Sequence, residues 1–438
     1  MTVRSHGPWS PGPLIEQTLA AAGLPPLPRL AWLEIDQDAL ANNLRVIRSM
    51  IPAGVEVAAV IKSDGYGHGL VGAARAFVDG GADRLCVSML DEAVALRRAG
   101  IAAPIVILFS IPPSEVAAAA GAGFELVASD AGLVRALLAA WRGRRRGGEA
   151  GRTQEPELRL HLEIETGLGR AGVTPEVAPA VATEILATPG CRLVGLWSHL
   201  ARPEDERFSA EQAARLSAAG EALTAAGIAT PPQHLSATGG LFAATAAPLS
   251  MVRPGLCLYG ELPADLPVAE RARAAADALR PAMAIKARPL RIADIEAGTP
   301  VGYGGRWTSE RRSRIATLPI GYGDGWARAY QPGAQALVRG RRVALVGSVA
   351  MDAIAADVTD VPEVSLADEF VLLGAQGSDR ITAAELARQR TTIAWEVLAG
   401  MANRMPRVYH AGSGWASMRT LEGEILVGRD ATILEPAQ

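Results

Sequence analysis

The segment "EVAAVIKSDGYGHG", residues Glu56–Gly69, joins an apolar stretch to a single cation. Its first residues are rich in Val and Ala, a composition typical of a strand buried on both faces. Lys62 follows, and then a turn rich in glycine and polar residues. Lysine is rarely buried unless it is paired or used in chemistry. Three interpretations of Lys62 stay open here: a lysine that only reaches solvent, one that binds an anion, and one that forms a Schiff base with an aldehyde.

The chain after this segment alternates short apolar strands with Ala-rich stretches of helical periodicity. Strands are expected at residues 56–62, 84–90, 105–110, 124–129, 159–165, 192–199, 234–238 and 251–255. Eight such units predict a (β/α)8 barrel, because parallel strands must be joined by crossover helices. An open doubly wound sheet has the same alternation, but no G-x-G-x-x-G motif follows the first strand.

The sequence pattern changes after about Arg280. In "RIATLPIGY" and "EFVLLG", Val, Ile and Leu alternate with polar residues, as in an antiparallel sheet with one wet face. The predicted fold class is therefore α/β, a TIM-type barrel followed by a mainly antiparallel β domain. The expected division is a mobile, Pro-rich lead-in at 1–28, the barrel at 29–275 and the β-rich domain at 276–438.

Bulk composition narrows the function classes. The 438 residues include 49% hydrophobic and 20% charged residues, and the net charge of −3 gives no electrostatic reason to expect nucleic acid or membrane partners. Three scattered cysteines argue for a reducing compartment and against a disulfide framework or a structural zinc site, so no metal is expected. Because the N-terminus lacks an unbroken apolar core and no apolar run is long enough to span a bilayer, we expect a cytoplasmic protein.

A barrel would gather the reactive side chains at one mouth, because active sites of this fold lie where the strands end at their carboxyl side. The residues that follow expected strands in this way are Lys62, Glu163, Glu165, Arg170, His199, Thr238, Arg253 and Gly255. Without a barrel, nothing in the sequence would bring these residues together.

The motif around Lys62 resembles the cofactor-lysine signature of the alanine racemase family, enzymes that use pyridoxal 5'-phosphate. The resemblance continues in family order through "HLEIETGLGRAG", "GLWSHLA", "VRPGLCLYG", "VGYGGRWT", "LPIGYGDGW" and "VAMD", and covers roughly residues 30 to 410. It implies an isomerase that interconverts L- and D-alanine and supplies D-alanine for cell-wall peptides.

The resemblance also implies which residues bind the cofactor. Lys62 would form the Schiff base. Further cofactor contacts are expected from Tyr66, His199, Thr238, Arg253, Gly255 and Leu256. Thr238, Gly255 and Leu256 would offer a hydroxyl and backbone N–H groups to the phosphate. Arg253 would face the pyridine nitrogen, and because arginine can only donate, the ring would stay unprotonated and would be a weak electron sink.

Racemisation is most direct with one base on each side of the cofactor. The resemblance matches Lys62 to one base and Tyr303 to the other, and implies that His199 links Tyr303 to Arg253. In the family, this tyrosine enters the barrel of a partner subunit. A homodimer with shared active sites is therefore expected.

The resemblance assigns the remaining site residues to the substrate. Arg170 would lie near the substrate carboxylate, steadied by Glu163 where many relatives have a carbamylated lysine. Met351 would meet the same carboxylate, with Asp352 in support, and Tyr322 would restrict side-chain size at the mouth.

Three positions depart from common family choices: Trp395, Ala237 and Glu163. Trp395 stands where a phosphate-binding tyrosine is usual, and an indole cannot accept a hydrogen bond. Serine or a larger amino acid therefore stays open as the substrate. Two different functions compete with racemisation: a fold-related decarboxylase, which would need a Gly-triplet phosphate loop and a carboxylate at the ring nitrogen, and a non-catalytic cofactor-binding protein, which would lack the second domain.

Overall fold

The structure is a computed structural model that describes residues 13–146, 156–412 and 414–427. Two compact units make up these residues. The barrel unit comprises Leu40–Gly65 and Ala73–Arg280, and the sheet unit comprises the described residues of Met1–Ala39, Tyr66–Gly72 and Pro281–Gln438. The chain therefore passes from the barrel unit to the sheet unit at Tyr66, four residues after Lys62.

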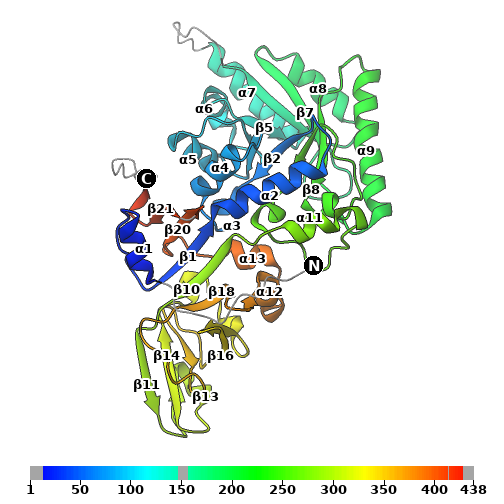
Figure 1. Cartoon of the computed structure of the whole chain (residues 1–438). Coiled ribbons are helices and arrows are strands. Elements are labelled where there is room, and N and C mark those ends of the chain that lie inside the picture. The colour runs from blue at the N-terminus through cyan, green and yellow to red at the C-terminus, as the bar shows by residue number, and fades with distance from the viewer. Residues whose placement is uncertain (1–12, 147–155, 413, 428–438) are drawn as a thin grey trace. The chain divides into compact units, whose positions relative to one another are not determined.

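Eight parallel strands close into a barrel in the order in which they occur along the chain (Figure 1). They are β2 (Glu56–Val60), β3 (Arg84–Val87), β4 (Ile105–Ile107), β5 (Glu125–Ala128), β6 (Leu158–Glu163), β7 (Cys191–Trp197), β8 (Gln233–Ala237) and β9 (Met251–Arg253). Each lies within or at the edge of a stretch predicted from the sequence. The predicted barrel is confirmed.

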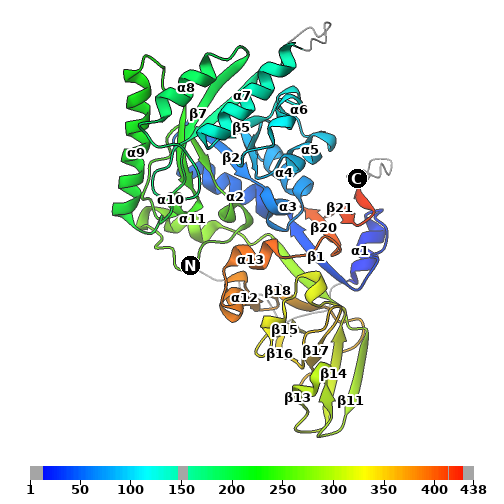
Figure 2. The same cartoon turned by 180° about the vertical axis from the view of Figure 1, so that it is seen from behind.

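Helices lie around the outside of these strands (Figure 2). They are α2 (Gln37–Met50), α4 (Leu70–Asp79), α5 (Leu90–Arg98), α6 (Val116–Gly121), α7 (Ala131–Arg146), α8 (Ala178–Leu186), α9 (Glu206–Ala225), α10 (Thr238–Phe242) and α11 (Arg273–Ala278). In α8 the buried residues Ala178, Val181, Ala182 and Ile185 recur every three or four positions, which places them on one face of the helix. Burial of such apolar faces against the strands is the main favourable free energy of this architecture.

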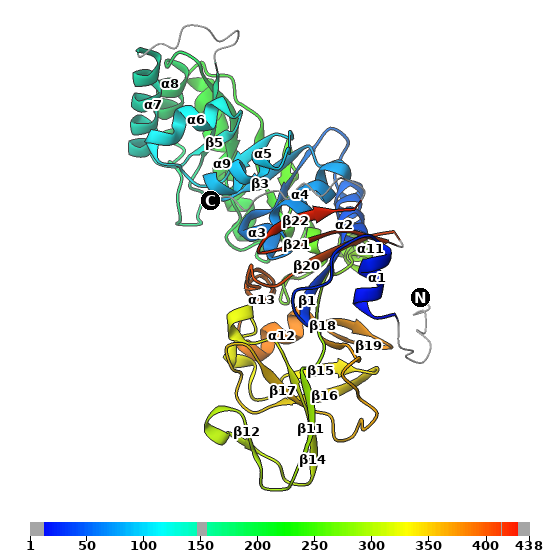
Figure 3. The same cartoon turned by 90° about the vertical axis from the view of Figure 1, so that its left-hand side faces the viewer.

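The sheet unit contains one large, mainly antiparallel sheet, as predicted. Its strand order is β11-β14-β17-β16-β15-β18-β10-β1-β20-β21-β22, and β19 pairs with β18 (Figure 3). The strands are β1 (Ala31–Asp36), β10 (Met283–Ala287), β11 (Arg291–Ile295), β14 (Ser313–Leu318), β15 (Gln335–Val338), β16 (Arg341–Val346), β17 (Ile354–Asp357), β18 (Phe370–Gln376), β19 (Asp379–Ile381), β20 (Arg407–Ala411), β21 (Gly414–Thr420) and β22 (Gly423–Leu426). A separate ribbon pairs β12 (Pro300–Val301) with β13 (Trp307–Thr308).

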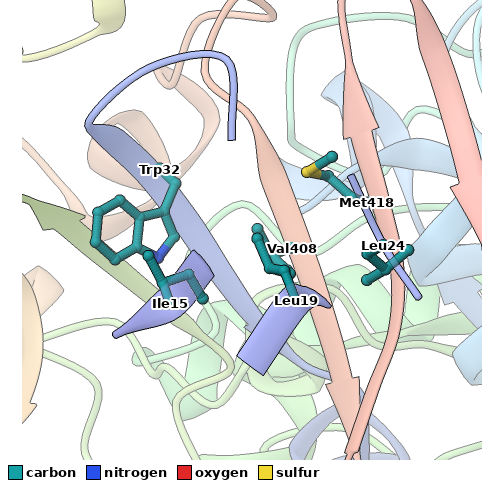
Figure 4. Close-up of a cluster of buried hydrophobic side chains, with 6 residues drawn as sticks. All are labelled: Ile15, Leu19, Leu24, Trp32, Val408 and Met418. Atoms are coloured by element: carbon teal, nitrogen blue, oxygen red, sulfur yellow. The ribbon is translucent and has the colours of Figure 1, made fainter. Parts of the chain in front are cut away.

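The strand nearest the N-terminus belongs to this sheet. β1 pairs antiparallel with β10 and parallel with β20, so it joins two segments that lie far apart in the sequence. Part of the predicted lead-in is also folded, because α1 (Ile15–Ala21) packs on the sheet (Figure 4). Ile15, Leu19, Leu24, Trp32, Val408 and Met418 form its buried cluster. Residues 1–12 of the lead-in lie outside the described residues.

Two short helices complete the sheet unit. They are α12 (Ala383–Arg390) and α13 (Ala394–Ala399). Thr382 caps α12 by accepting a hydrogen bond from the Glu385 backbone N–H at 3.0 Å. Among the described helices, none combines the length and the hydrophobicity that crossing a bilayer requires.

Candidate active site

The predicted site residues of the barrel unit all lie at the carboxyl ends of strands. Lys62 begins the short element α3 (Lys62–Tyr66) directly after β2, and Arg253 is the last residue of β9. Thr238 begins α10 directly after β8, and His199 follows β7 by two residues. Because all eight strands are parallel, their carboxyl ends meet at one mouth of the barrel.

The turn after Lys62 is left-handed. Ser63, Asp64, Gly65 and Tyr66 have φ angles between +51° and +61°. Such angles are unfavourable for residues other than glycine, so the local structure must be held by its surroundings. Glu92 supplies part of that support: its carboxylate accepts hydrogen bonds from the backbone N–H of Ser63 at 2.6 Å and from that of Ser88 at 2.9 Å. The sequence did not predict this conformation.

Lys62 is half-buried, and its surroundings favour the neutral amine. Burial, followed by the positive charge of Arg170, lowers the pKa of Lys62 from its usual 10.5, and the charge of Glu92 opposes the shift only in part. A lysine with a lowered pKa is more often a free amine near neutral pH, which is the form that attacks an aldehyde.

Arg253 is almost fully buried, with 2% of its surface exposed. Its guanidinium donates to Nδ1 of His234 at 2.5 Å, to the Ser198 carbonyl at 2.6 Å, to the Leu235 carbonyl at 3.2 Å and to Nδ1 of His199 at 3.4 Å. Within the described part of the chain, no hydrogen bond uses its Nε–H. The Nε–H is therefore left for a ligand.

Burial also shifts the pKa values around Arg253. Desolvation is the largest effect on its own pKa, which falls to about 10. At His199, burial and the charges of Arg253, Arg170 and Lys62 lower the pKa to about 3. His199 is thus a neutral imidazole at physiological pH, able to accept one hydrogen bond and donate another.

The predicted phosphate residues lie together. The Gly255 backbone N–H donates to Oγ1 of Thr238 at 3.1 Å, and the Cys257 N–H lies 3.4 Å from the same oxygen. Leu256 is buried and begins the 3₁₀ turn Leu256–Tyr259, next to Gly255. The hydroxyl and the backbone of these two loops lie at the ends of adjacent strands β8 and β9.

Arg170 and Glu163 form the ion pair that the sequence suggested. Nη2 of Arg170 lies 3.4 Å from Oε1 of Glu163, which is buried at the end of β6. Glu165 holds the intervening turn by accepting hydrogen bonds from the backbone N–H groups of Gly167 and Gly169. The guanidinium also lies over the ring of Phe109, 5.3 Å from its centroid.

Tyr66 lies in a glycine-rich segment that belongs to the sheet unit. Arg407 donates to the Gly67 carbonyl at 2.9 Å, and Tyr409 donates to the His68 carbonyl at 3.0 Å. A Cβ at Gly69 would lie only 1.9 Å from the Tyr409 hydroxyl, so glycine is required for this close approach. Tyr66 itself is buried.

The predicted site residues of the sheet unit also gather with one another. The Tyr322 backbone N–H donates to the Ala350 carbonyl at 3.0 Å, and Ala350 directly precedes Met351. Arg404 joins Asp324 to Asp352, at 2.7 Å from each carboxylate. Ser348 donates to the Tyr303 carbonyl at 2.8 Å, and the Tyr303 side chain is 77% exposed.

Sequence reasoning missed four polar residues inside the barrel: Arg84, Glu125, His161 and His234. They are linked to one another and to Arg253 by hydrogen bonds. Each lies in a barrel strand, as His161 does in "RLHLE" and His234 in "QHLSA". A polar residue in a strand that is expected to be buried was the available signal, but it is also compatible with a purely structural role.

Comparison with known proteins agrees with this geometry. The family model described as the alanine racemase N-terminal domain matches residues 35–263, and the model of the C-terminal domain matches residues 282–409. An alanine racemase of Symbiobacterium thermophilum is 37% identical over 383 residues, which is 87% of this chain and 97% of the relative. One from Syntrophobacter fumaroxidans is 36% identical over 384 residues, 87% of this chain and 98% of the relative.

Solved structures agree as well. The crystal structure of alanine racemase from Bacillus anthracis with bound L-Ala-P superposes with a TM-score of 0.81 at 29% identity, and covers 90% of this chain and 98% of that one. The structure of alanine racemase from E. faecalis has a TM-score of 0.77 at 30% identity, and covers 87% of this chain and 98% of that one.

Proposed function

The chain belongs to the alanine racemase family of isomerases, and we propose that it interconverts L- and D-alanine with pyridoxal 5'-phosphate bound at the mouth of the barrel. Arg253 is the observation on which the proposal depends most. It is a buried cation at the end of β9, its described hydrogen bonds go to imidazoles and carbonyls, and its Nε–H is left for a ligand acceptor.

The residues at the mouth fit this cofactor. Lys62 has the lowered pKa that covalent attachment of an aldehyde requires. Thr238, Gly255 and Leu256 offer a hydroxyl and backbone groups suited to a phosphate. When bound there, pyridoxal 5'-phosphate would supply the electron sink that makes the α-hydrogen of an amino acid acidic.

Arg253 would limit that acidity. Arginine has no acceptor and keeps its protons, so it can only donate a hydrogen bond to a pyridine nitrogen, and the nitrogen stays unprotonated. A carboxylate in this position would instead keep the nitrogen protonated and would favour decarboxylation or transamination as well. The buried arginine therefore supports a reaction confined to moving a proton at Cα.

Two groups would move that proton. Lys62, once released from the cofactor, would remove or return it on one face, and Tyr303 would do so on the opposite face. We propose that Tyr303 comes from a partner subunit, because its side chain is largely exposed on the sheet unit of its own chain. His199, which lies 3.4 Å from Arg253, would orient the tyrosine hydroxyl.

The substrate would be held by its carboxylate. Arg170 provides a charged donor that Glu163 and Phe109 orient, and the loop around Met351, supported by Asp352, would add a backbone donor. Tyr322 would limit the size of the side chain at the mouth. Serine and larger amino acids are the competing substrates, since Trp395, Ala237 and Glu163 differ from common family residues.

The test uses the purified protein loaded with pyridoxal 5'-phosphate and incubated with pure L-alanine in D2O. We expect loss of optical rotation together with deuterium at Cα, and faster turnover for alanine than for L-serine or L-leucine. Tyr303→Phe should slow exchange from one enantiomer more than from its mirror image. Retained rotation with the cofactor bound would reject the proposal, and equal, negligible effects of Tyr303→Phe would reject this tyrosine as a base.

A further inference from the structure

A row of polar side chains crosses the inside of the barrel and ends at Arg253. Nη1 of Arg84 lies 2.5 Å from Oε1 of Glu125, and Oε2 of Glu125 lies 3.0 Å from Nε2 of His161. Nδ1 of His161 lies 3.0 Å from Nε2 of His234, whose Nδ1 lies 2.5 Å from Arg253. These residues come from β3, β5, β6, β8 and β9. Arg84 on β3 contacts Glu125 on β5, and His161 on β6 contacts His234 on β8. Because the strands of each pair are not neighbours in the barrel, these contacts cross the barrel interior.

The row is buried along most of its length. Glu125, His161, His234 and Arg253 are each no more than 4% exposed. Burying a charge costs free energy unless hydrogen bonds or an opposite charge compensate for it. Arg253 receives direct compensation from carbonyls and imidazoles, and the nearest carboxylate along the row, Glu125, is two imidazole rings away.

Arg253 dictates the direction of the hydrogen bonds that run from it through His234 and His161 to Glu125. An arginine only donates, so Nδ1 of His234 must accept, and the single proton of this neutral ring lies on Nε2. That Nε2–H donates to Nδ1 of His161, and the proton of His161 therefore lies on its own Nε2. The last bond is donated to Glu125, which can accept it as a carboxylate. Both rings are neutral, with the same tautomer.

We propose that Glu125, His161 and His234 are positioning residues that hold the Arg253 guanidinium in a fixed orientation through hydrogen bonds that all point toward Glu125. This inference rests on the proposed function, because it gives these residues a role through the arginine that would face the cofactor. Glu125, the carboxylate at the far end of the row, also pairs with Arg84 and is separated from Arg253 by two imidazole rings. The guanidinium donates to imidazoles and carbonyls, and none of its described hydrogen bonds goes to a carboxylate.

The neighbouring strand is shaped to admit the row. Gly195 lies on β7, next to His161 on β6. A Cβ at Gly195 would lie 2.0 Å from Nδ1 of His161 and 2.8 Å from its Cε1, well inside contact distance. Its φ is not in the left-handed region, so the space for the imidazole explains this glycine better than backbone freedom does. Trp197 covers His234 from the same strand, with the two rings stacked 5.8 Å apart.

The first test reads the tautomers directly and needs no cofactor. The full chain contains six histidines, so ¹⁵N labelling of histidine with His161→Gln and His234→Gln for assignment resolves both rings. We expect protonated Nε2 and unprotonated Nδ1 in both rings at neutral pH, in the protein with and without pyridoxal 5'-phosphate. A protonated Nδ1 or an imidazolium in either ring would overturn the proposal, whether or not the protein racemises alanine.

The second test disturbs the row by substitution. Gly195→Ala should displace His161, and His161→Leu should remove its hydrogen bonds. For both, we expect an altered absorption spectrum of the bound cofactor and a fall in kcat of roughly tenfold, as for the loss of one charge-assisted hydrogen bond, with little change in KM for alanine. His161→Gln should restore much of the loss, since its amide can accept from His234 and donate to Glu125.

Leu160→Ala is the matched control, because Leu160 is the buried neighbour of His161 on β6 and its side chain faces the opposite side of the strand. It should lower stability but leave the cofactor spectrum unchanged. If Leu160→Ala and His161→Leu change the spectrum and kcat equally, the row is only a structural core and the proposal fails. If the protein shows no racemisation but its histidines have the expected tautomers, the proposed function is rejected and the inferred positioning of Arg253 still stands.

Discussion

The positive charge of Arg170 lowers the pKa of Lys62, and only burial has a larger effect on it. Only the neutral amine attacks an aldehyde, so the protein without cofactor should capture pyridoxal 5'-phosphate at a lower pH than an exposed lysine would. Arg170→Gln removes a positive charge, which raises the pKa of Lys62. The pH profile of capture, followed by the absorption of the lysine-bound cofactor, should then move to higher pH.

Arg192→Gln is a suitable control for this prediction, because Arg192 is near the start of β7, at the amino end of a strand, and its side chain is largely exposed. Its capture profile should match that of the unmodified protein. Identical profiles for Arg170→Gln and the unmodified protein would show that the guanidinium does not tune the amine.

Glu163 supplies a permanent carboxylate beside Arg170. The unmodified protein should therefore turn over alanine equally well in CO2-free buffer and in bicarbonate buffer. Glu163→Gln keeps the shape and loses the charge, and KM for alanine should rise about threefold to tenfold, as when a charge-assisted hydrogen bond becomes a neutral one. Initial rates over a range of alanine concentrations measure the effect. An unchanged KM would mean that Arg170 needs no anionic partner.

At the scale of elements, the left-handed turn after β2 depends on α5. Glu92 accepts hydrogen bonds from the Ser63, Ser88 and Met89 backbone N–H groups, and so ties the turn to the start of this helix. Glu92→Ala should destabilise the protein by about 1–3 kcal/mol, because it removes a helix cap and leaves backbone donors unpaired. Urea unfolding measures this loss, and a weaker affinity for pyridoxal 5'-phosphate should accompany it.

The exposed neighbour Asp91 provides the comparison, since Asp91→Ala changes a charge at the same helix terminus without touching the turn. It should cost less stability and leave cofactor affinity unchanged. Equal losses of affinity in the two variants would mean that the turn does not need Glu92.

Elements whose residues are near in sequence could be predicted, and those that depend on distant partners could not. The barrel strands follow from apolar runs, and the antiparallel strands of the sheet unit from alternating apolar and polar residues. The place of β1 between β10 and β20 was not predicted, because the backbone of a strand can form hydrogen bonds with the edge of any other strand, and the sequence of β1 does not say which. The turn at Ser63–Tyr66 was missed for a similar reason: its φ angles are imposed by contacts such as that of Glu92.

The candidate site shows the same division. Lys62, Arg253 and Tyr303 lie in recognisable local motifs, and their positions at strand ends and on the sheet unit follow from the predicted fold. The row through Glu125, His161 and His234 does not, since its meaning appears only when three strands bring single polar residues to hydrogen-bond distance. Gly195 is likewise interpretable only once its neighbour His161 is known.

At the scale of the whole molecule, the proposed reaction divides its groups between the two units. Lys62 lies in the barrel unit and Tyr303 in the sheet unit, and we propose that each site combines the lysine of one subunit with the tyrosine of its partner. Co-expressed Lys62→Ala and Tyr303→Ala chains test this sharing. Random pairing makes half of the dimers mixed, and each mixed dimer would contain one intact site of two, so about a quarter of the native activity should return.

The reciprocal mixture makes this test decisive. A chain with both substitutions is co-expressed in equal amount with the unmodified chain. If sites are shared, both sites of a mixed dimer are inactive, and only the dimers of two unmodified chains, about a quarter of the total, keep their activity. If each chain used its own tyrosine, the mixed dimer would keep one site, leaving about half, and the first mixture would stay inactive. Because Tyr303 is largely exposed, its loss should not impair folding. About a quarter of the activity in both mixtures therefore supports shared sites, whereas no activity in the first mixture and about half in the second would show that each chain uses its own tyrosine.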